Sequence, residues 1–319
     1  MGKRKATDKD QTASKDKMDV DGEDSGSEDV RFITPQQRSS TQANTRTQDE
    51  SILNVDFEFF DPQPDVDFHG LKTLLRQLFD VDNQLFDLSE LSDMILAQPL
   101  LGSTVKCEGN ESDPFAFLTV LNLHQHREKA VIRELTKYLL ARSATVSKDH
   151  HDSLQTLVDA STSQSQVGLI LTERFINMPA QLVPPMYNML LEEMDWALEE
   201  KEPYQFSHYL IISKTYTEVD SKLDAEEDRP GKKAKKAAAK KEVETFFFHA
   251  EDEVLKRFAA ASWAFEYEKV GEDGASDAKR AFQEAGVRPQ GLALLIEGAK
   301  FKDAVKAVEE YLGGGGEVA

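Results

Sequence analysis

Apolar residues recur with two different periods between residues 51 and 270, and these periods predict both strands and helices. Val55, Phe57 and Phe59 alternate with polar or charged residues, which predicts a strand buried on one face. The four leucines of FHGLKTLLRQLF follow the helical period instead and predict an amphipathic helix. A second helix is predicted over LSELSDMILAQ, with Asp87 or Ser89 as its N-terminal cap.

The middle of the chain continues this alternation of elements. TVKCEG and FAFLTVLNL predict two strands joined across the turn-rich GNESDP. AVIRELTKYLLARS then predicts an amphipathic helix, SLQTLV a short helix, and VGLILTE a strand. The order of these segments favours a sheet with helices packed on it.

The stretch RFINMPAQLVPPMY combines apolar residues with three prolines, each of which lacks a backbone donor. We interpret Pro184 and Pro185 as the first turn of a helix over PPMYNMLLEEMDWALEE, where missing N–H groups cost least. Pro179 shapes the loop that precedes it. The apolar residues of the loop are either packed inside the fold or offered to a partner, and we favour packing.

Three closing strands, QFSHYLIISKTYTEV, VETFFFHAEDEVL and ASWAFEYEKV, complete a mixed α/β domain that we place at residues 51–270. Residues 1–50 have few large apolar groups and predict a disordered tail, and residues 220–242 predict a disordered charged insertion. Residues 271–319 are expected to lie outside the domain. We expect there a linker, short helices over SDAKRAFQEAG and KFKDAVKAVEEYL, and a flexible glycine tail.

The chain of 319 residues has 58 acidic and 38 basic residues and a net charge of −20. Such a field repels nucleic acid and anionic membranes and attracts basic partners. The simpler alternative is an acidic protein whose charge only keeps it in solution. MGKRKATDKD contains no apolar run, so we expect no secretory signal. One cysteine, Cys107, excludes a disulfide within the chain.

Motifs for catalysis, cofactors and metals are absent from the sequence, so we predict no catalytic, cofactor-binding or metal-binding residues. There is no P-loop and no G-x-G-x-x-G after a strand. The histidines of HQH (124 and 126) and DHHD (150 and 151) are too few for a zinc site, and we interpret them as surface residues. Cys107 lies in a strand-like run without a neighbouring histidine, which argues against a nucleophile.

Two basic clusters are candidate nuclear import signals, although a plain charged terminus or loop explains each equally well. The serines Ser25 and Ser27 precede acidic residues and are candidate phosphorylation sites. The second cluster lacks interleaved aromatic residues, which argues against nucleic-acid binding. The import candidates are Lys3, Arg4 and Lys5 in the first cluster and Lys232, Lys233, Lys235, Lys236, Lys240 and Lys241 in the second.

Three separated motifs of the chain are VDFEFFDPQPDVDFHGLKTLLRQLF, RFINMPAQLVPPMY, and HYLIISKTY with FFFHAEDE. They occur in the order that is typical of the BCCIP family. The chain resembles fungal members of that family over about residues 50–270. The resemblance implies a mixed, largely antiparallel central sheet flanked by helices, similar to GCN5-related acetyltransferases but without a coenzyme site. Acetyltransferases hold the coenzyme pyrophosphate on a glycine-bearing turn at a helix N-terminus. We match that turn to LNLHQHREKAV, which contains no glycine.

The resemblance further implies a non-enzymatic nuclear chaperone that shuttles to the cytoplasm. Its implied partners are a basic ribosomal protein of the large subunit, the nuclear transport machinery, and a lipid kinase such as a phosphatidylinositol phosphate kinase. We expect a monomer that contacts neither nucleic acid nor membrane directly. A divergent acyltransferase and a scaffold for cell-cycle or DNA-repair partners are the alternatives. The candidate client-binding residues are Glu192, Glu193, Asp195, Glu199 and Glu200 on the helix MLLEEMDWALEEKE.

Overall fold

The structure is a computed structural model, and residues 54–319 form one compact unit in it. The predicted tail, the charged insertion, the linker, the glycine tail after Gly313, and all but the last residue of the helix predicted over SDAKRAFQEAG lie outside the described residues. The structure describes residues 56–99, 101–159, 166–218, 244–269 and 286–313.

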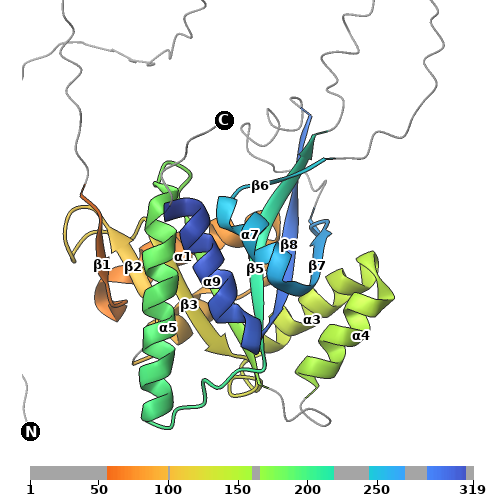
Figure 1. The fold of residues 1–319 in the computed structure, drawn as a ribbon, viewed down its shortest axis with the longest axis horizontal. Helices are drawn as coiled ribbons and strands as arrows, with labels where there is room; N and C mark the ends of the chain where they lie inside the picture. Colours follow the sequence, from red (N-terminus) through yellow and green to blue (C-terminus); the bar gives the residue numbers. More distant parts are fainter. Residues whose placement is uncertain (1–55, 100, 160–165, 219–243, 270–285, 314–319) are drawn as a thin grey trace, which may run out of the picture. The chain divides into compact units, whose positions relative to one another are not determined.

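An eight-stranded sheet, counted over the described residues, is the frame of this unit (Figure 1). Every pairing in it is antiparallel except that of the fourth strand with the fifth. A mixed, largely antiparallel sheet flanked by helices was predicted, and it is confirmed. Across the sheet the strands are β1 (Glu58–Phe60), β2 (Ser103–Lys106), β3 (Ala116–Asn122), β4 (Val167–Arg174), β5 (His208–Glu218), β8 (Val287–Glu297) and β7 (Ala259–Phe265), and β6 (Thr245–Phe247) pairs with β5.

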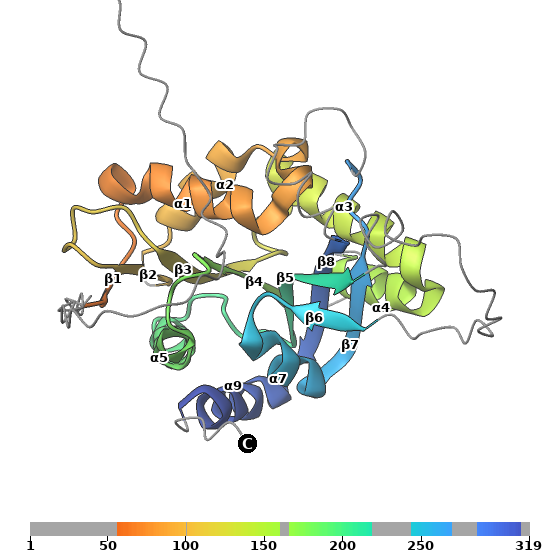
Figure 2. The ribbon, with the colours of Figure 1, turned by 90° about the horizontal axis from the view of Figure 1, so that it is seen from above.

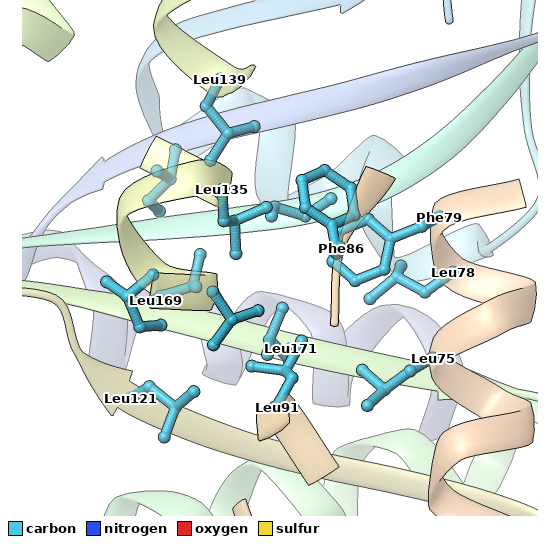
Figure 3. Close-up of a cluster of buried hydrophobic side chains, with 14 of the residues drawn as sticks. Leu75, Leu78, Phe79, Phe86, Leu91, Leu121, Leu135, Leu139, Leu169 and Leu171 are labelled. Carbon is cyan, nitrogen blue, oxygen red and sulfur yellow. The ribbon is translucent and has the colours of Figure 1, made fainter. Parts of the chain in front are cut away.

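One face of the sheet is covered by the helices α1 (Pro64–Phe79), α2 (Leu88–Leu96), α3 (Ala130–Val146) and α4 (Lys148–Val158). A short 3₁₀ helix, η1 (Asp80–Leu85), joins the first two. Leucines of these helices and of β3 and β4 pack into one core, which Figure 3 shows. The helices predicted over FHGLKTLLRQLF, LSELSDMILAQ and AVIRELTKYLLARS are confirmed as α1, α2 and α3, and the predicted short helix SLQTLV lies within α4.

The opposite face carries α5 (Val183–Glu199), α7 (Ala250–Phe258) and α9 (Gly298–Gly313), with the 3₁₀ turn η2 (Ala180–Leu182) before α5 (Figure 2). Their apolar side chains form a second core with the other face of the strands. A stacked pair of rings, Tyr209 on β5 and Phe301 on α9, lies in it with centroids 4.0 Å apart.

The prediction of one strand over VETFFFHAEDEVL is wrong, because only β6 is extended and α7 follows it. Three acidic residues fall in the first turn of α7, where they complement the positive end of the helix. Val254 and Leu255 face the second core. The three consecutive phenylalanines at the start of this stretch favour a strand and concealed the change of period that follows them.

The predicted domain boundary at residue 270 is also wrong. β8 lies between β5 and β7 in the middle of the sheet, so the segment assigned to a linker and helices holds a central strand. GLALLIE is apolar on both faces, as a strand covered by two helix layers requires. The predicted helix KFKDAVKAVEEYL exists as most of α9, but its Phe301, Val305 and Val308 are buried in the second core.

Candidate functional site

The parallel pair β4–β5 is the place where the acetyltransferase resemblance can be tested. Among the described strands it is the sole parallel pair, and α5 is the helix of its crossover. α/β folds bind anions at the N-terminus of such a crossover helix. The turn equivalent to the pyrophosphate-binding turn is therefore the one between β4 and α5. Our match to LNLHQHREKAV, between β3 and α3, is wrong.

The turn before α5 lacks the donors that a pyrophosphate needs. Pro184 and Pro185 are the second and third residues of the helix, within its first turn, so two of the N–H groups that would face an anion do not exist. Residues 174–199 contain no glycine that would let a phosphate approach the backbone. The predicted helix entry through the double proline is confirmed. Met178 is buried in the second core, as expected, whereas Ile176 is 88% exposed.

At the β3–α3 junction, a side chain already occupies the N-terminus of α3. The carboxylate of Glu90 on α2 accepts a hydrogen bond of 3.2 Å from the backbone N–H of Val131, in the first turn of α3. An anionic side chain thus already satisfies this helix N-terminus. A bound phosphate would have to displace it.

A cluster of buried polar residues fills the gap where β4 and β5 separate. The two strands pair only as far as Leu171 and Ile212, and β6 then takes the place of β4 beside β5. We call Glu173, Ser213, Lys214, His249 and Asp252 the splay cluster. All five are buried.

The His249 ring lies in that gap and reaches both faces of the sheet. Glu173 and Lys214 point toward α1, and Ser213 points toward α7. His249 Nε2 is 3.0 Å from Glu173 Oε1, and its Nδ1 is 3.4 Å from Ser213 Oγ. Lys214 Nζ is 2.6 Å from Glu173 Oε2 and donates to the Gln77 carbonyl of α1 at 3.0 Å. The cluster therefore connects β4, β5, α1 and the start of α7.

Charges within the cluster hold each other ionised. Burial opposes ionisation of Glu173, but the hydrogen bond and charge of His249, together with Lys214, outweigh it and hold the pKa of this carboxyl below its ordinary value. Burial likewise disfavours the imidazolium of His249, yet Glu173 and then Asp252 raise its pKa above the ordinary value. Burial raises the pKa of Asp252. The arrangement favours a buried imidazolium beside the Glu173 carboxylate, whereas burial shifts Asp252 toward its neutral acid form.

Serine, histidine and a carboxylate are the residue types of a hydrolytic triad, but this arrangement does not suit that chemistry. A general base must be neutral to accept the serine proton, and the raised pKa of His249 favours its protonated form. The Ser213 hydroxyl donates to Asp252 and is only 1% exposed. A second buried pair, Arg174 with both oxygens of Glu251, ties β4 to α7 beside it. These contacts stabilise the sheet where its strands diverge.

The predicted client-binding residues lie on α5, and the structure separates them. Glu192, Glu199 and Glu200 are exposed, and Asp195 is exposed but paired with Lys302 of α9 at 2.9 Å. Glu193 points inward, so its assignment to the surface is wrong.

Glu193 has a structural task instead. It is 7% exposed and accepts hydrogen bonds from the Gly102 N–H at 2.8 Å and the Ser103 hydroxyl at 3.3 Å. Burial raises the pKa of its carboxyl, and these two donors oppose that shift. Its neighbour in sequence, Glu192, lies on the other side of the helix because successive residues are turned by about 100°.

An exposed tryptophan stands among the outward carboxylates of α5. Trp196 is 57% exposed. Its helical spacing of four from Glu192, and of three and four from Glu199 and Glu200, places all four on one stripe with Asp195. We call these five residues the α5 stripe. The last turn of α5 has no basic residue, so the negative end of the helix adds to their field.

A cavity of about 490 Å³ adjoins the residues that follow α5. Its acidic wall is formed by Glu90 and Asp93 of α2 and by Glu202, and Tyr204 contributes an aromatic side. His126 and Lys129 also line the cavity, and burial and then Lys129 lower the pKa of His126. We call this the acidic cavity. Carboxylates beside apolar surface suit the head and the aliphatic stem of a lysine or arginine.

The remaining candidates give little support for chemistry. Burial and then Glu108 raise the pKa of Cys107, which disfavours the reactive thiolate. His150 stacks on Trp263 with ring centroids 5.2 Å apart, so this predicted surface residue is only partly exposed. No group of three histidine, cysteine, aspartate or glutamate residues within the described ranges could hold a metal ion.

No helix among the described residues is long and apolar enough to cross a membrane. All import and phosphorylation candidates lie outside the described residues.

Sequence reasoning missed the splay cluster, although a signal for it exists. Glu173 and Lys214 each interrupt an apolar strand run, VGLILTER and HYLIISKTY, at a position that faces the core. Opposite charges at such positions predict a buried pair.

Comparison with known proteins identifies the relatives of this chain. The BCCIP family model matches residues 52–255. Protein bcp1 of Aspergillus fumigatus is 61% identical over 264 residues, which are 82% of this chain and 88% of that protein. Protein bcp1 of Schizosaccharomyces pombe is 51% identical over 264 residues, which are 82% and 92% of the two chains. The crystal structure of BCP1 from Saccharomyces cerevisiae superposes with a TM-score of 0.55 at 28% identity, covering 83% of this chain and 92% of that one.

Proposed function

The chain belongs to the BCCIP family, and from this membership we propose that it is a non-enzymatic escort of a basic ribosomal protein of the large subunit. It binds this client in the nucleus, supports ribosome biogenesis, and shuttles to the cytoplasm through the nuclear transport machinery. It also assists the nuclear export of a further client, such as a phosphatidylinositol phosphate kinase.

The α5 stripe is the observation that carries this proposal. A basic client meets there four carboxylates, of which Asp195 is paired with Lys302, and the negative end of a helix, and this field steers its approach. Trp196 supplies a large apolar anchor of the kind that dominates binding energy at protein interfaces. The acidic cavity accepts a lysine or arginine of the same client.

The turn before α5 supports the non-enzymatic part of the proposal. Two prolines replace backbone donors at the place where an acyltransferase would hold its coenzyme. Isothermal calorimetry with acetyl-CoA tests this directly, and we expect no heat of binding up to millimolar coenzyme. Micromolar binding would favour the divergent acyltransferase.

Co-purification from cells tests the escort function. The intact protein should enrich a basic large-subunit ribosomal protein, and its recovery should fall as salt is raised. Replacing Trp196 with alanine should weaken binding about thirtyfold, which corresponds to the ~2 kcal/mol of a hot-spot residue. Enrichment of repair or cell-cycle factors without a ribosomal protein would contradict the proposal.

A pair of matched charge variants locates the surface. Neutralising Glu192, Glu199 and Glu200 to glutamine should reduce client recovery. Neutralising Glu134, Asp149 and Asp152, which are exposed on α3 and α4, changes the net charge equally and should leave recovery nearly unchanged. Equal losses in the two variants would mean that net charge, and not the α5 stripe, attracts the client.

A further inference from the structure

A second cavity, of about 340 Å³, is lined like the acidic cavity by residues of the β3–α3 turn. It is bounded by that turn, by α3 and by the end of α4. Its floor is aliphatic and consists of Leu123, Ile132, Leu140 and Val158. An apolar floor of this kind suits one aliphatic side chain of a ligand.

The rim of this cavity is basic, although the chain as a whole carries a net charge of −20. Among the residues that the structure describes, Arg127 forms an ion pair with its exposed neighbour Glu128 alone, at 3.4 Å. Arg133 and Lys137 make no side-chain ion pair or hydrogen bond with any other described residue. They are four residues apart on α3, where like charges repel each other. A bound anion would relieve this repulsion.

His124 adds a polar group to the wall. Its Nδ1 accepts the Val167 N–H at 3.4 Å, so in the neutral ring the proton is on Nε2. That Nε2 is buried and makes no hydrogen bond of normal geometry. Burial and then Arg127 lower the pKa of His124, and the Leu157 carbonyl only opposes this shift. Because Nε2 is inaccessible and the Leu157 carbonyl lies beside the ring, this N–H is not available to a ligand, and the anion-binding groups of the cavity are those of the rim.

We propose that this cavity, which we call the basic cavity, is a docking site for an acidic peptide segment of a partner protein. One aliphatic side chain of the segment enters the floor, and carboxylates on either side of it contact Arg127, Arg133 and Lys137. Charge complementarity selects this occupant, because the ligand must be anionic to satisfy the rim and partly apolar to fill the floor. Nucleic acid fits less well, since the lining has no phenylalanine, tyrosine or tryptophan on which bases could stack.

The basic cavity goes beyond the proposed client site and differs from it in sign and position. It is built on the α3–α4 layer, whereas the α5 stripe lies on the layer that covers the other face of the sheet (Figure 2). A basic client and an acidic partner can therefore be bound at the same time. The protein becomes an adaptor that joins two proteins of opposite charge.

Fluorescence polarisation with the full-length protein tests this inference. The probe is a fluorescein-labelled synthetic peptide in which one central leucine is flanked by five glutamates. We expect saturable binding at about 50 mM salt that weakens steeply toward physiological ionic strength. Replacing the leucine of the probe with serine should weaken binding several-fold, because the aliphatic contact with the floor is lost. Absence of saturable binding would overturn the proposal.

Paired charge reversals locate the site on the protein. Arg133→Glu with Lys137→Glu should raise the Kd at least tenfold. Lys300→Glu with Lys306→Glu on α9 makes the same change in net charge and should alter the Kd less than twofold. An equal increase in Kd for the two variants would mean that the peptide is attracted by the net charge of the protein and not by the basic cavity. Should the first variant unfold, Lys137→Gln alone should raise the Kd about threefold.

Two further arms separate this proposal from its alternatives. A protein with the α5 stripe glutamates neutralised should bind the peptide with unchanged Kd, so failure of the client site and failure of the basic cavity are distinguishable. Oligouridylate with the same number of charges should compete weakly. Stronger competition by the oligonucleotide than by unlabelled peptide would overturn the peptide assignment in favour of RNA.

Discussion

Replacing Glu173 with glutamine removes the central anion of the splay cluster while keeping its shape. The side chain is 0% exposed and lies 2.6 Å from Lys214 Nζ and 3.0 Å from His249 Nε2. The side chains of Lys214 and His249 are only 11% and 7% exposed. Without the Glu173 carboxylate, the ammonium and the imidazolium lose the counter-charge that they share. Removing one partner of a buried ion pair costs about 3–5 kcal/mol. This loss is about a third of the typical free energy of unfolding of a protein.

Urea unfolding followed by far-UV circular dichroism measures this loss. Glu266→Gln is the matched control, since Glu266 pairs with Arg288 at 2.8 Å but both side chains are about half exposed. We expect the control to lose at most about 1 kcal/mol. Adding Lys214→Met to Glu173→Gln should recover part of the stability, because fewer unpaired charges stay buried. A loss for Glu173→Gln no larger than that of the control would refute our account of the cluster.

Three further substitutions test the reasoning elsewhere. The raised pKa of His249 contributes stability that is complete below about pH 6.5 and is lost as pH rises through the folded pKa. Thermal melts of the wild type should thus fall more between pH 6 and pH 9 than those of His249→Gln, and parallel slopes would contradict this. Gly291→Ala places a Cβ 2.4 Å from the Phe265 ring and should cost about 1–3 kcal/mol in urea unfolding, whereas Gly313→Ala meets nothing within 4 Å and should be neutral. Asp87→Ala removes the side chain that caps two N–H groups of α2 and should cost about 1 kcal/mol in the same assay; no change would show that the cap is dispensable.

Local patterns predicted most elements because one face of each element is buried against a core. The leucine period of α1 follows directly from that one-sided burial, whereas β1 covers only Glu58–Phe60, none of which is fully buried. Asp87 was one of two predicted caps, and the structure selects it. The double proline marked the start of α5 correctly, since its geometry depends only on neighbouring residues.

Positions that depend on distant segments could not be predicted in this way. Glu193 was assigned to the surface with its acidic neighbours, and only the approach of Gly102 and Ser103 from another part of the chain explains its burial. β8 was read as part of a linker and helices because its two neighbours, β5 and β7, precede it by long intervals of sequence. We also matched the coenzyme-binding turn to the wrong junction. That turn precedes the crossover helix of the parallel pair β4–β5, and which strands are parallel is decided only when the sheet assembles.

The sequence by itself determined the class of the fold, the family, the excess of negative charge, and the boundaries of elements whose signals are local. The tertiary structure alone decided which acidic residues of α5 face solvent, how β4 and β5 diverge, and which charges fill the gap between them. It also placed a basic cavity beside an acidic one on a strongly acidic protein. The physical reason is that periodicity records what one element buries, whereas a site forms from side chains that several elements bring together.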